Sequence, residues 1–404
     1  MKQFRKTKLN QRGFGHVEAV IAILVIAGIA AVGARVLFAS HAQTPDPVIA
    51  YQTVSATPLS ESVNTANVYS GAVSTISPNN LLATSPRYST NGQYIAWEGS
   101  ANPDSTNTGQ IGIYNTQTNT QKVISLPTGT SFANSFSDLQ WYPSNTKLAF
   151  VAATEPTGSF AYQLETINTD GTGATVVPNV NAGNESTGSL ISSLAVTGDG
   201  QYIVYSNGSA VYSVMPGSQP VLMTKGECSN IRTVPGTSDT VVYYCGKNHS
   251  NGYTQTIYRG TTASKKSSEK IAAIFTYTAT KTTKVGTTYQ FINSFMPSSD
   301  GSTLAIDNQV TTVTAACTAN TNISIGTLPI NSTGTLKTLY TGPSTSVSNC
   351  RGGGGGDIND VVWSPSGSSI AYLGANSSLN VLSSLNSTAV SKQLVAGNAG
   401  DLSW

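Results

Sequence analysis

The sequence predicts an all-β fold of repeated β-hairpins, preceded by one membrane-spanning helix, and three observations support this prediction. First, charged residues make up only 10% of the 404 residues, and Ser, Thr, Asn and Gly fill most polar positions. This composition favours short strands joined by turns over surface helices. Second, a short phrase that reads as a hairpin recurs along the chain. Third, the N-terminus combines a basic segment with a long apolar one.

The N-terminal segment has the pattern of a membrane anchor. Between residues 17 and 38 the only charges are Glu18 and Arg35. A helix of this length spans about 33 Å, close to the ~30 Å thickness of the bilayer's hydrocarbon core. The bases that precede it have no acid among them: Lys2, Arg5, Lys6, Lys8 and Arg12. We therefore expect a cytoplasmic leader over 1–13 and a single transmembrane helix over 14–38.

Two kinds of processing are compatible with this segment. Gly13, Phe14 and Glu18 resemble the class III (type IV prepilin-like) signal, in which cleavage follows the Gly and the acid becomes the fifth mature residue. The helix of a pilin would continue, whereas Pro45 ends this one soon after the membrane. We therefore interpret the segment as a retained anchor. The alternative is a secretory signal peptide that is cleaved after Ala42, because "SHA" fits a small-x-small site.

One phrase recurs through the body of the chain and is clearest in "INDVVWSPSGSSIAYLG" (358–374). It reads as an apolar strand, a turn and a second strand with an aliphatic–small–aromatic triplet. The turn residues tolerate positive φ, as a tight hairpin requires: Asn91-Gly92, Asp199-Gly200, Asp300-Gly301 and Ser366-Gly367. The triplets are Ile95-Ala96-Trp97, Leu148-Ala149-Phe150, Ile203-Val204-Tyr205, Val241-Val242-Tyr243, Leu304-Ala305-Ile306 and Ile370-Ala371-Tyr372.

Further strand-like pieces lie between the copies, such as 109–118 and 210–217. Each unit therefore holds roughly four strands. Repeated four-stranded units of about 40–60 residues, arranged radially, form a β-propeller. The hairpin strands are too apolar to face water on both sides, so a stacked arrangement is required.

The two ends of the chain supply one more unit. The terminal "DLSW" aligns with "DLQW" and "DVVW", the first strands of two complete copies, and Ile49-Ala50-Tyr51 supplies the triplet that should follow it. The pieces 65–71 and 73–77 are then the third and fourth strands. We expect a short linker over 39–47 and a seven-bladed propeller over 48–404 that is closed by its N- and C-terminal strands. Six blades are the alternative.

The phrase "WSPSGSSIAYLG" is similar to the repeat of the TolB-like propeller family, W-S-P-D-G-x-x-I-A-F, and the resemblance covers roughly residues 44–404. Repeat positions that match the family's Asp and aromatic residues are interpreted as structural: Asp138, Trp141, Asp360, Trp363, Asp401 and Trp404. The resemblance implies an extracytoplasmic propeller that binds proteins or peptides through the loops at one end.

Four cysteines, all in the second half of the chain, are candidates for disulfides: Cys228, Cys245, Cys317 and Cys350. Four cysteines permit three connectivities. We expect the local pairs Cys228–Cys245 and Cys317–Cys350 if the compartment is oxidising. The alternative is that they are buried free thiols.

Catalytic and nucleotide-binding motifs are missing from the sequence. It has no G-x-S-x-G, no phosphate-binding loop and no G-x-G-x-x-G. His249 is the only histidine of the propeller region and lies in a polar segment, so we predict no catalytic, metal or cofactor site. Beyond residue 12 acids outnumber bases, which excludes a nucleic-acid footprint. The basic stretch 259–284 is interpreted as a solvated insertion.

We therefore expect a monomeric, single-pass protein of the cell membrane with an extracytoplasmic propeller that acts as a binding or scaffolding module for proteins or peptides. One alternative is an envelope enzyme that acts on glycans or peptides through acids in the propeller funnel. Another is an accessory component of a type IV pilus-like system, which Gly13, Phe14 and Glu18 suggest. If the chain is cleaved after Ala42, the propeller is secreted.

Overall fold

The computed structural model describes residues 48–404 with several gaps, which are 57–58, 101–108, 133–138, 155–160, 181, 184–189, 250–251, 263–267, 279–287, 315–317, 332–333, 349–359, 375–376 and 386–387. The expected leader, transmembrane helix and linker lie outside the described residues, and so do Gly13, Phe14, Glu18 and Ala42. Asp138, Cys317 and Cys350 lie in the gaps. Within the part of the chain that is described, no helix has the length and apolar character needed to cross a membrane.

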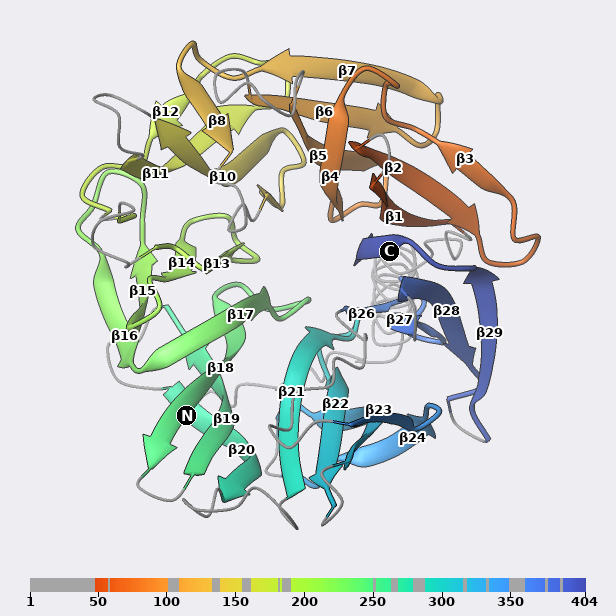
Figure 1. Cartoon of the computed structure of the whole chain (residues 1–404). Helices are drawn as coiled ribbons and strands as arrows, with labels where there is room; N and C mark the ends of the chain where they lie inside the picture. The colour runs from red at the N-terminus through yellow and green to blue at the C-terminus, as the bar shows by residue number, and fades with distance from the viewer. Residues whose placement is uncertain are drawn as a thin grey trace, which may run out of the picture. The chain divides into compact units, whose positions relative to one another are not determined.

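The described strands form seven antiparallel sheets, the blades, arranged as a ring (Figure 1). Blade 1 contains β4 (Leu82–Tyr88), β5 (Tyr94–Ser100), β6 (Gly109–Asn115) and β7 (Thr120–Ser125). Blade 2 contains β8 (Thr130–Phe132), β9 (Gln140–Trp141), β10 (Lys147–Thr154), β11 (Ala161–Asn168) and β12 (Thr175–Val176). Blade 3 contains β13 (Ser193–Val196), β14 (Ile203–Ser206), β15 (Ala210–Val214) and β16 (Val221–Lys225).

The second half of the ring repeats this plan. Blade 4 contains β17 (Glu227–Thr233), β18 (Thr240–His249), β19 (Gly252–Thr261) and β20 (Ser268–Thr278). Blade 5 contains β21 (Thr288–Pro297), β22 (Thr303–Val313), β23 (Thr318–Pro329), β24 (Lys337–Thr341) and β25 (Thr345–Ser348). Blade 6 contains β26 (Val361–Trp363), β27 (Ile370–Gly374), β28 (Ser378–Ser383) and β29 (Val390–Val395). Since β19 and β20 occupy much of 259–284, the interpretation of that stretch as an insertion was wrong.

Blade 7 is built from both ends of the described chain and contains β30 (Ala399–Ser403), β1 (Val48–Ala56), β2 (Leu59–Asn67) and β3 (Val73–Thr75). In the closing pair, Tyr51 lies opposite Leu402. The prediction of seven blades closed in this way is confirmed, and the six-bladed alternative is wrong. The third strand ends at Asn67 instead of continuing to residue 71, because the Asn67 side chain accepts hydrogen bonds from the backbone N–H groups of Tyr69 and Ser70 and starts a turn.

The triplets explain how the blades pack. Among the described residues the buried apolar side chains form seven clusters, and each cluster joins two neighbouring blades. In blade 1, Ile95 and Trp97 pack against blade 7, whereas Ala96 between them packs against blade 2. Successive residues of a strand point to opposite faces, so a small central residue allows close approach on one side while large neighbours fill the other.

The two ends of the ring differ in their connections. At one end, which we call the short-turn end, compact turns join the first two strands of a blade, as at 89–93, 197–202 and 364–369. Gly92, Gly200, Gly301 and Gly367 adopt φ between 68° and 70° there, as the sequence predicted. At the opposite end, which we call the loop end, β5 ends at Ser100 and β6 begins at Gly109.

Candidate functional site

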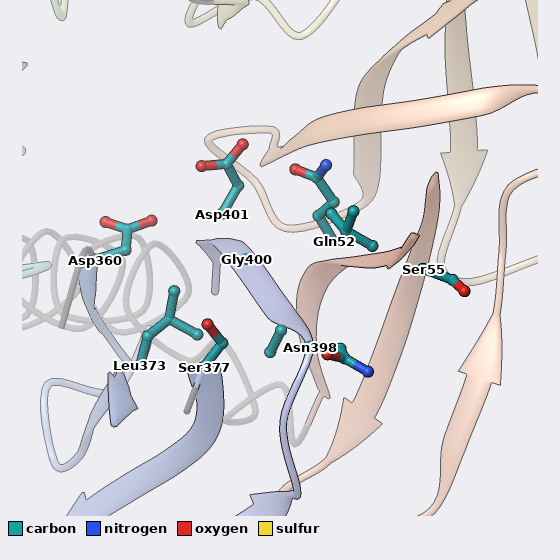
Figure 2. A pocket seen from close by; sticks show the side chains of 10 residues that line it. Gln52, Ser55, Asp360, Leu373, Ser377, Asn398, Gly400 and Asp401 are labelled. Carbon is teal, nitrogen blue, oxygen red and sulfur yellow. The ribbon is translucent and has the colours of Figure 1, made fainter. Parts of the chain in front are cut away.

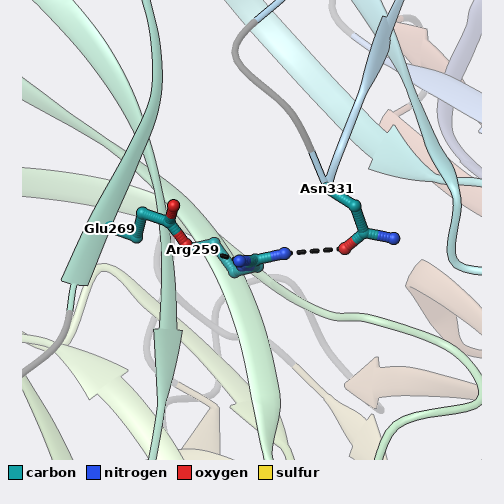
Figure 3. Close-up of polar contacts among 3 residues, drawn as sticks. All are labelled: Arg259, Glu269 and Asn331. Atoms are coloured by element: carbon teal, nitrogen blue, oxygen red, sulfur yellow. Dashed lines mark hydrogen bonds and ion pairs between the residues drawn. The ribbon is translucent and has the colours of Figure 1, made fainter.

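A cavity of about 510 Å³ opens at the loop end, between blades 6 and 7 (Figure 2). Its volume falls in the range of about 300–1,000 Å³ that is usual for small-ligand sites. Polar side chains line it from several strands and loops: Gln52, Ser55, Asp360, Ser377, Asn398 and Asp401. The apolar part of the described lining comes from Val54, Leu373 and Ala399. The described lining contains two carboxylates and no cationic side chain.

Asp360 and Asp401 occupy the same repeat position at the first strand of their blades, which we call the inner strand. Each directly precedes a buried apolar residue, Val361 in β26 and Leu402 in β30. The Oδ2 atom of Asp360 accepts a hydrogen bond from the backbone N–H of Leu402 in the next blade, at 2.9 Å. At the equivalent position of blade 3, Ser193 Oγ accepts one from the N–H of Ile231, at 2.8 Å. In these two blades the position therefore links the inner strand to that of the next blade.

Asp401 is held by a β-bulge. In the pairing of β30 with β1, Leu402 lies opposite Tyr51 and Gly400 lies opposite Gln52, so Asp401 has no opposite residue. Its φ is +30°. Ser85 and Asn230, at the same position of blades 1 and 4, also have positive φ beside a bulge (53° and 55°). The unusual backbone is thus a property of the repeat and is not specific to the cavity.

Figure 2 shows Asp360, Asp401 and Gln52 extending their polar ends in a similar direction from three different segments. Asp401 Oδ2 accepts a hydrogen bond from Ser85 Oγ at 3.2 Å. No other hydrogen bond to Asp401 is formed by residues of the described part of the chain. A carboxylate can accept several hydrogen bonds, so Asp401 retains free acceptor capacity at the cavity.

Like charges adjoin one another along this part of the ring. Burial is the largest influence on the pKa of Asp360 and raises it, and the Asp401 charge raises it further. The Arg87 charge, the Leu402 hydrogen bond and the Arg232 charge lower this pKa but do not cancel the effect of burial, so the pKa of Asp360 is raised. Burial, followed by the Asp401 charge, raises the pKa of Glu61.

The charge of Asp360 also acts on a further acid. Asp307 of β22 is 0% exposed, and its Oδ1 atom has no hydrogen-bond partner among the described residues. Its Oδ2 atom accepts a hydrogen bond from Asn293 at 3.1 Å. Burial raises the pKa of Asp307 well above its ordinary value, against the lowering effect of the Asn293 hydrogen bond, and the Asp360 charge raises it further.

The tryptophans of the repeat bind the blades to one another. The indole N–H of Trp141 donates to the Arg87 carbonyl of blade 1 at 2.9 Å, and that of Trp363 donates to the Met296 carbonyl of blade 5 at 3.0 Å. Trp404 is partly buried against the apolar cluster between blades 6 and 7. None of the three lines the cavity.

The remaining candidates lie away from the cavity. Cys228 and Cys245, which face each other on β17 and β18, form a disulfide, as the local pairing predicted. His249 is the last residue of β18 and lies opposite Gly252. Within the described ranges, no group of three or more His, Cys, Asp and Glu residues could hold a metal ion.

Sequence reasoning placed Asp360 and Asp401 in the repeat but missed the side chains that share the cavity with them. Gln52 and Leu373 directly follow their triplets, and Asp307 does the same in blade 5. The residue after the triplet could therefore have been inspected as a repeat position. Ser377 and Asn398 lie in connections that differ from copy to copy, so no pattern in the sequence marked them.

The chain matches no protein-family model and no curated protein sequence. Among solved structures, it is similar to an oligogalacturonate lyase in complex with manganese, with a TM-score of 0.54, 10% identity and 85% of each chain covered. It is also similar to the uncomplexed acylaminoacyl peptidase of Pyrococcus horikoshii, with a TM-score of 0.51, 12% identity and coverage of 88% of this chain and 52% of the peptidase.

TolB from Acinetobacter baumannii is a third similar structure, with a TM-score of 0.44, 15% identity and coverage of 72% of this chain and 65% of TolB. The chain thus spans about half of the peptidase and less than two thirds of TolB. At 10% and 12% identity, the lyase and the peptidase show a shared fold, and a shared fold does not fix function.

Proposed function

We propose that this protein is a membrane-anchored, extracytoplasmic propeller that binds a protein or peptide partner at its loop end. The observation that carries the proposal is the cavity between blades 6 and 7, which combines carboxylates, amides and apolar side chains. Such a mixture suits a peptide segment, because the polar backbone and side-chain groups of a peptide can bind the polar lining and its apolar side chains can pack on the apolar lining. Loops carried on a rigid scaffold are also where binding sites usually lie.

The first described residue of the chain and the cavity lie toward different ends of the ring. Val48, the first described residue, lies opposite Asn67, where the turn to β3 begins, and therefore at the short-turn end. Val54 and the cavity lie toward the other end of the same strand. The chain that precedes residue 48 therefore joins the propeller at the short-turn end, and the cavity lies toward the loop end.

A photo-crosslinking amino acid at Val54 tests the binding function. Val54 lines the cavity and is 39% exposed, and Val123 of β7, which is 38% exposed and outside the cavity lining, is a matched control. In intact cells we expect protein adducts from position 54 and none from position 123. Equal adducts from both positions, or none from position 54, would count against a partner site at the loop end.

Mass spectrometry of the mature N-terminus tests the anchor. A chain that begins at Met1 or Phe14 keeps the apolar segment, whereas a chain that begins at Gln43 has lost it and is released. Protease added to intact cells should reach the propeller, because the proposal places it outside the membrane. A mature Phe14 would in addition support a role in a pilus-like system.

A second candidate function is an envelope enzyme that acts on glycans or peptides, and the acids at the cavity are the observation that favours it. Asp360 has a raised pKa and stands beside Asp401, a combination that is common at catalytic sites. Loss of substrate turnover in Asp360→Asn and Asp401→Asn, without loss of crosslinked partner, would support the enzyme. Partner capture without any turnover of peptide or glycan pools supports the binding module.

A further inference from the structure

The described lining of the cavity between blades 6 and 7 carries negative charge, which favours a ligand with positive charge. This lining contains the carboxylates of Asp360 and Asp401 and no cationic side chain. Arg87 and Arg232 act on Asp360 electrostatically, yet neither lines the cavity. Each donates a hydrogen bond from Nη1 to a backbone carbonyl next to it in sequence, at 2.9 Å and 3.0 Å. A ligand that carries positive charge would therefore meet two carboxylates and no cationic side chain in the described lining, while Arg87 and Arg232 act on Asp360 from outside that lining.

A second observation points to the same kind of ligand. Asp307 is fully buried, the charge of Asp360 acts on it, and its Oδ1 atom lacks a hydrogen-bond partner in the described part of the molecule. A buried polar atom without a partner is costly and calls for an explanation. A cation bound at Asp360 would favour the ionised form of this second carboxyl group, because charges interact strongly away from bulk water.

The apolar lining selects an organic cation. Val54, Leu373 and Ala399 form hydrocarbon surface beside the carboxylates. Lys and Arg side chains place their methylene stems on such surface and their charged heads among polar groups. Gln52 and Asn398 add amide oxygens that can accept hydrogen bonds from an ammonium or a guanidinium.

We propose that this cavity binds the cationic side chain, lysine or arginine, of a peptide segment in the partner. The proposal rests on the proposed binding function and names the chemistry of its ligand. Asp401 supplies the principal acceptor, Asp360 the second charge, and the apolar wall holds the stem of the ligand side chain.

Calorimetric titration of the full chain in detergent micelles tests the proposal with defined probes. The probes are capped pentapeptides, Ala-Ala-Arg-Ala-Ala and its lysine form, and the control peptide carries citrulline, which keeps the shape of arginine without its charge. We expect the charged peptides to bind about tenfold to a hundredfold more tightly than the citrulline peptide, the ratio that a charge-assisted hydrogen bond supplies. Equal affinities would overturn the proposal.

Two variants of the chain place the binding at this cavity. Asp401→Asn keeps an acceptor for Ser85 but removes the charge, and it should weaken binding of the arginine peptide about tenfold or more. Asp170→Asn makes the same charge change at an exposed turn of the short-turn end and should leave binding unchanged. If the Asp401→Asn variant binds as the parent does, the site is elsewhere and the proposal fails.

Val54→Lys is an independent variant for the case in which Asp401→Asn does not fold, since Val54 is partly exposed on β1. Its own ammonium should occupy the cavity and abolish peptide binding. Calcium or magnesium that binds in place of the peptide, with no affinity for arginine, would also overturn the proposal. Failure of these titrations while crosslinks from position 54 persist would reject the cationic ligand but not the binding function.

Discussion

The carboxylate of Asp360 accepts a hydrogen bond from the backbone N–H of Leu402, with 2.9 Å between Oδ2 and N. Asp360 directly precedes β26 of blade 6, and Leu402 lies in β30 of blade 7, so the bond crosses the junction beside the ring closure. Leu402 is 2% exposed. Its N–H group is therefore shielded from water and depends on a protein acceptor. Asp360 thus lines the cavity and also links two blades.

Replacing Asp360 with Ala should lower the free energy of unfolding by about 1–3 kcal/mol, because the N–H of Leu402 loses its acceptor in a buried place. Asp360→Asn keeps an oxygen at this point and should lose less. Urea denaturation of the two variants and the parent measures the difference. If the Ala and Asn variants unfold at the same urea concentration, the hydrogen bond contributes nothing to stability.

Asp307→Asn should make the protein more stable at pH 7. Burial raises the pKa of Asp307 well above its ordinary value, while in the unfolded chain an Asp titrates near about 3.9. At a pH between these two pKa values, Asp307 is protonated in the folded chain and ionised in the unfolded chain. The free energy of unfolding therefore falls as pH rises through that interval. The advantage of the Asp307→Asn variant should shrink as the pH is lowered toward about 4.

Asp300→Asn is a control with the opposite sign. Hydrogen bonding, first of all from Ser298, lowers the pKa of Asp300. The stability that this carboxylate contributes is present above the unfolded pKa and is lost as pH falls through the folded one. The Asp300→Asn variant should thus be less stable than the parent at pH 7. Urea denaturation across the acid and neutral pH range compares both variants, and parallel profiles for the two would contradict the assignment.

Gly112→Ala should destabilise blade 1. A Cβ atom at Gly112 would lie 2.0 Å from Cε2 of Trp97, whose side chain is 0% exposed and cannot move aside freely. Overpacking of this kind costs about 1–3 kcal/mol. Gly99→Ala on the neighbouring strand is a matched control, since its nearest contact would be 3.4 Å away.

The Trp97→Phe background separates the contact from other effects of the alanine. Phenylalanine has no counterpart of the outer indole atoms, such as Cζ2, which would lie 2.2 Å from a Cβ atom at Gly112, so Gly112→Ala should be better tolerated there. A double-mutant cycle on thermal or urea unfolding measures the coupling between the two positions. Additive effects would show that the close approach is not what Gly112 provides.

The Cys228–Cys245 disulfide should stabilise the folded chain by about 3 kcal/mol, as expected for a crosslink that closes a loop of this length. Cys228→Ser with Cys245→Ser should lower the melting temperature under oxidising conditions, and reduction of the parent should lower it equally. Alkylation of protein from the intact cell, followed by mass spectrometry, shows whether the bond forms in the native compartment. Free thiols at both positions there would contradict an oxidising location.

Much of the fold could be predicted because its signals are local. The triplets, the Asn-Gly and Asp-Gly turns and the match between "DLSW" and earlier copies each depend on a few consecutive residues. The apolar strands required neighbours on both faces, which led to stacked blades and to a ring closed by the chain ends. The ends of the strands could not be predicted as well. The strand β2 ends at Asn67 because the side chain of Asn67 accepts hydrogen bonds from two backbone N–H groups of the following turn, and the hydrophobic periodicity carries no signal of such a bond.

The sequence by itself determined the hairpin units, their number and the strands that close the ring, since hydrophobic pattern and turn residues act over short distances. Only the tertiary structure decided that Asp360, Asp401 and Gln52 would share one cavity, and that the charge of Asp360 would act on the buried Asp307. These groups come from three blades, and no spacing along the chain encodes their approach. Closure of the ring brings them together, so the chemistry of the candidate site is a consequence of the packing between blades.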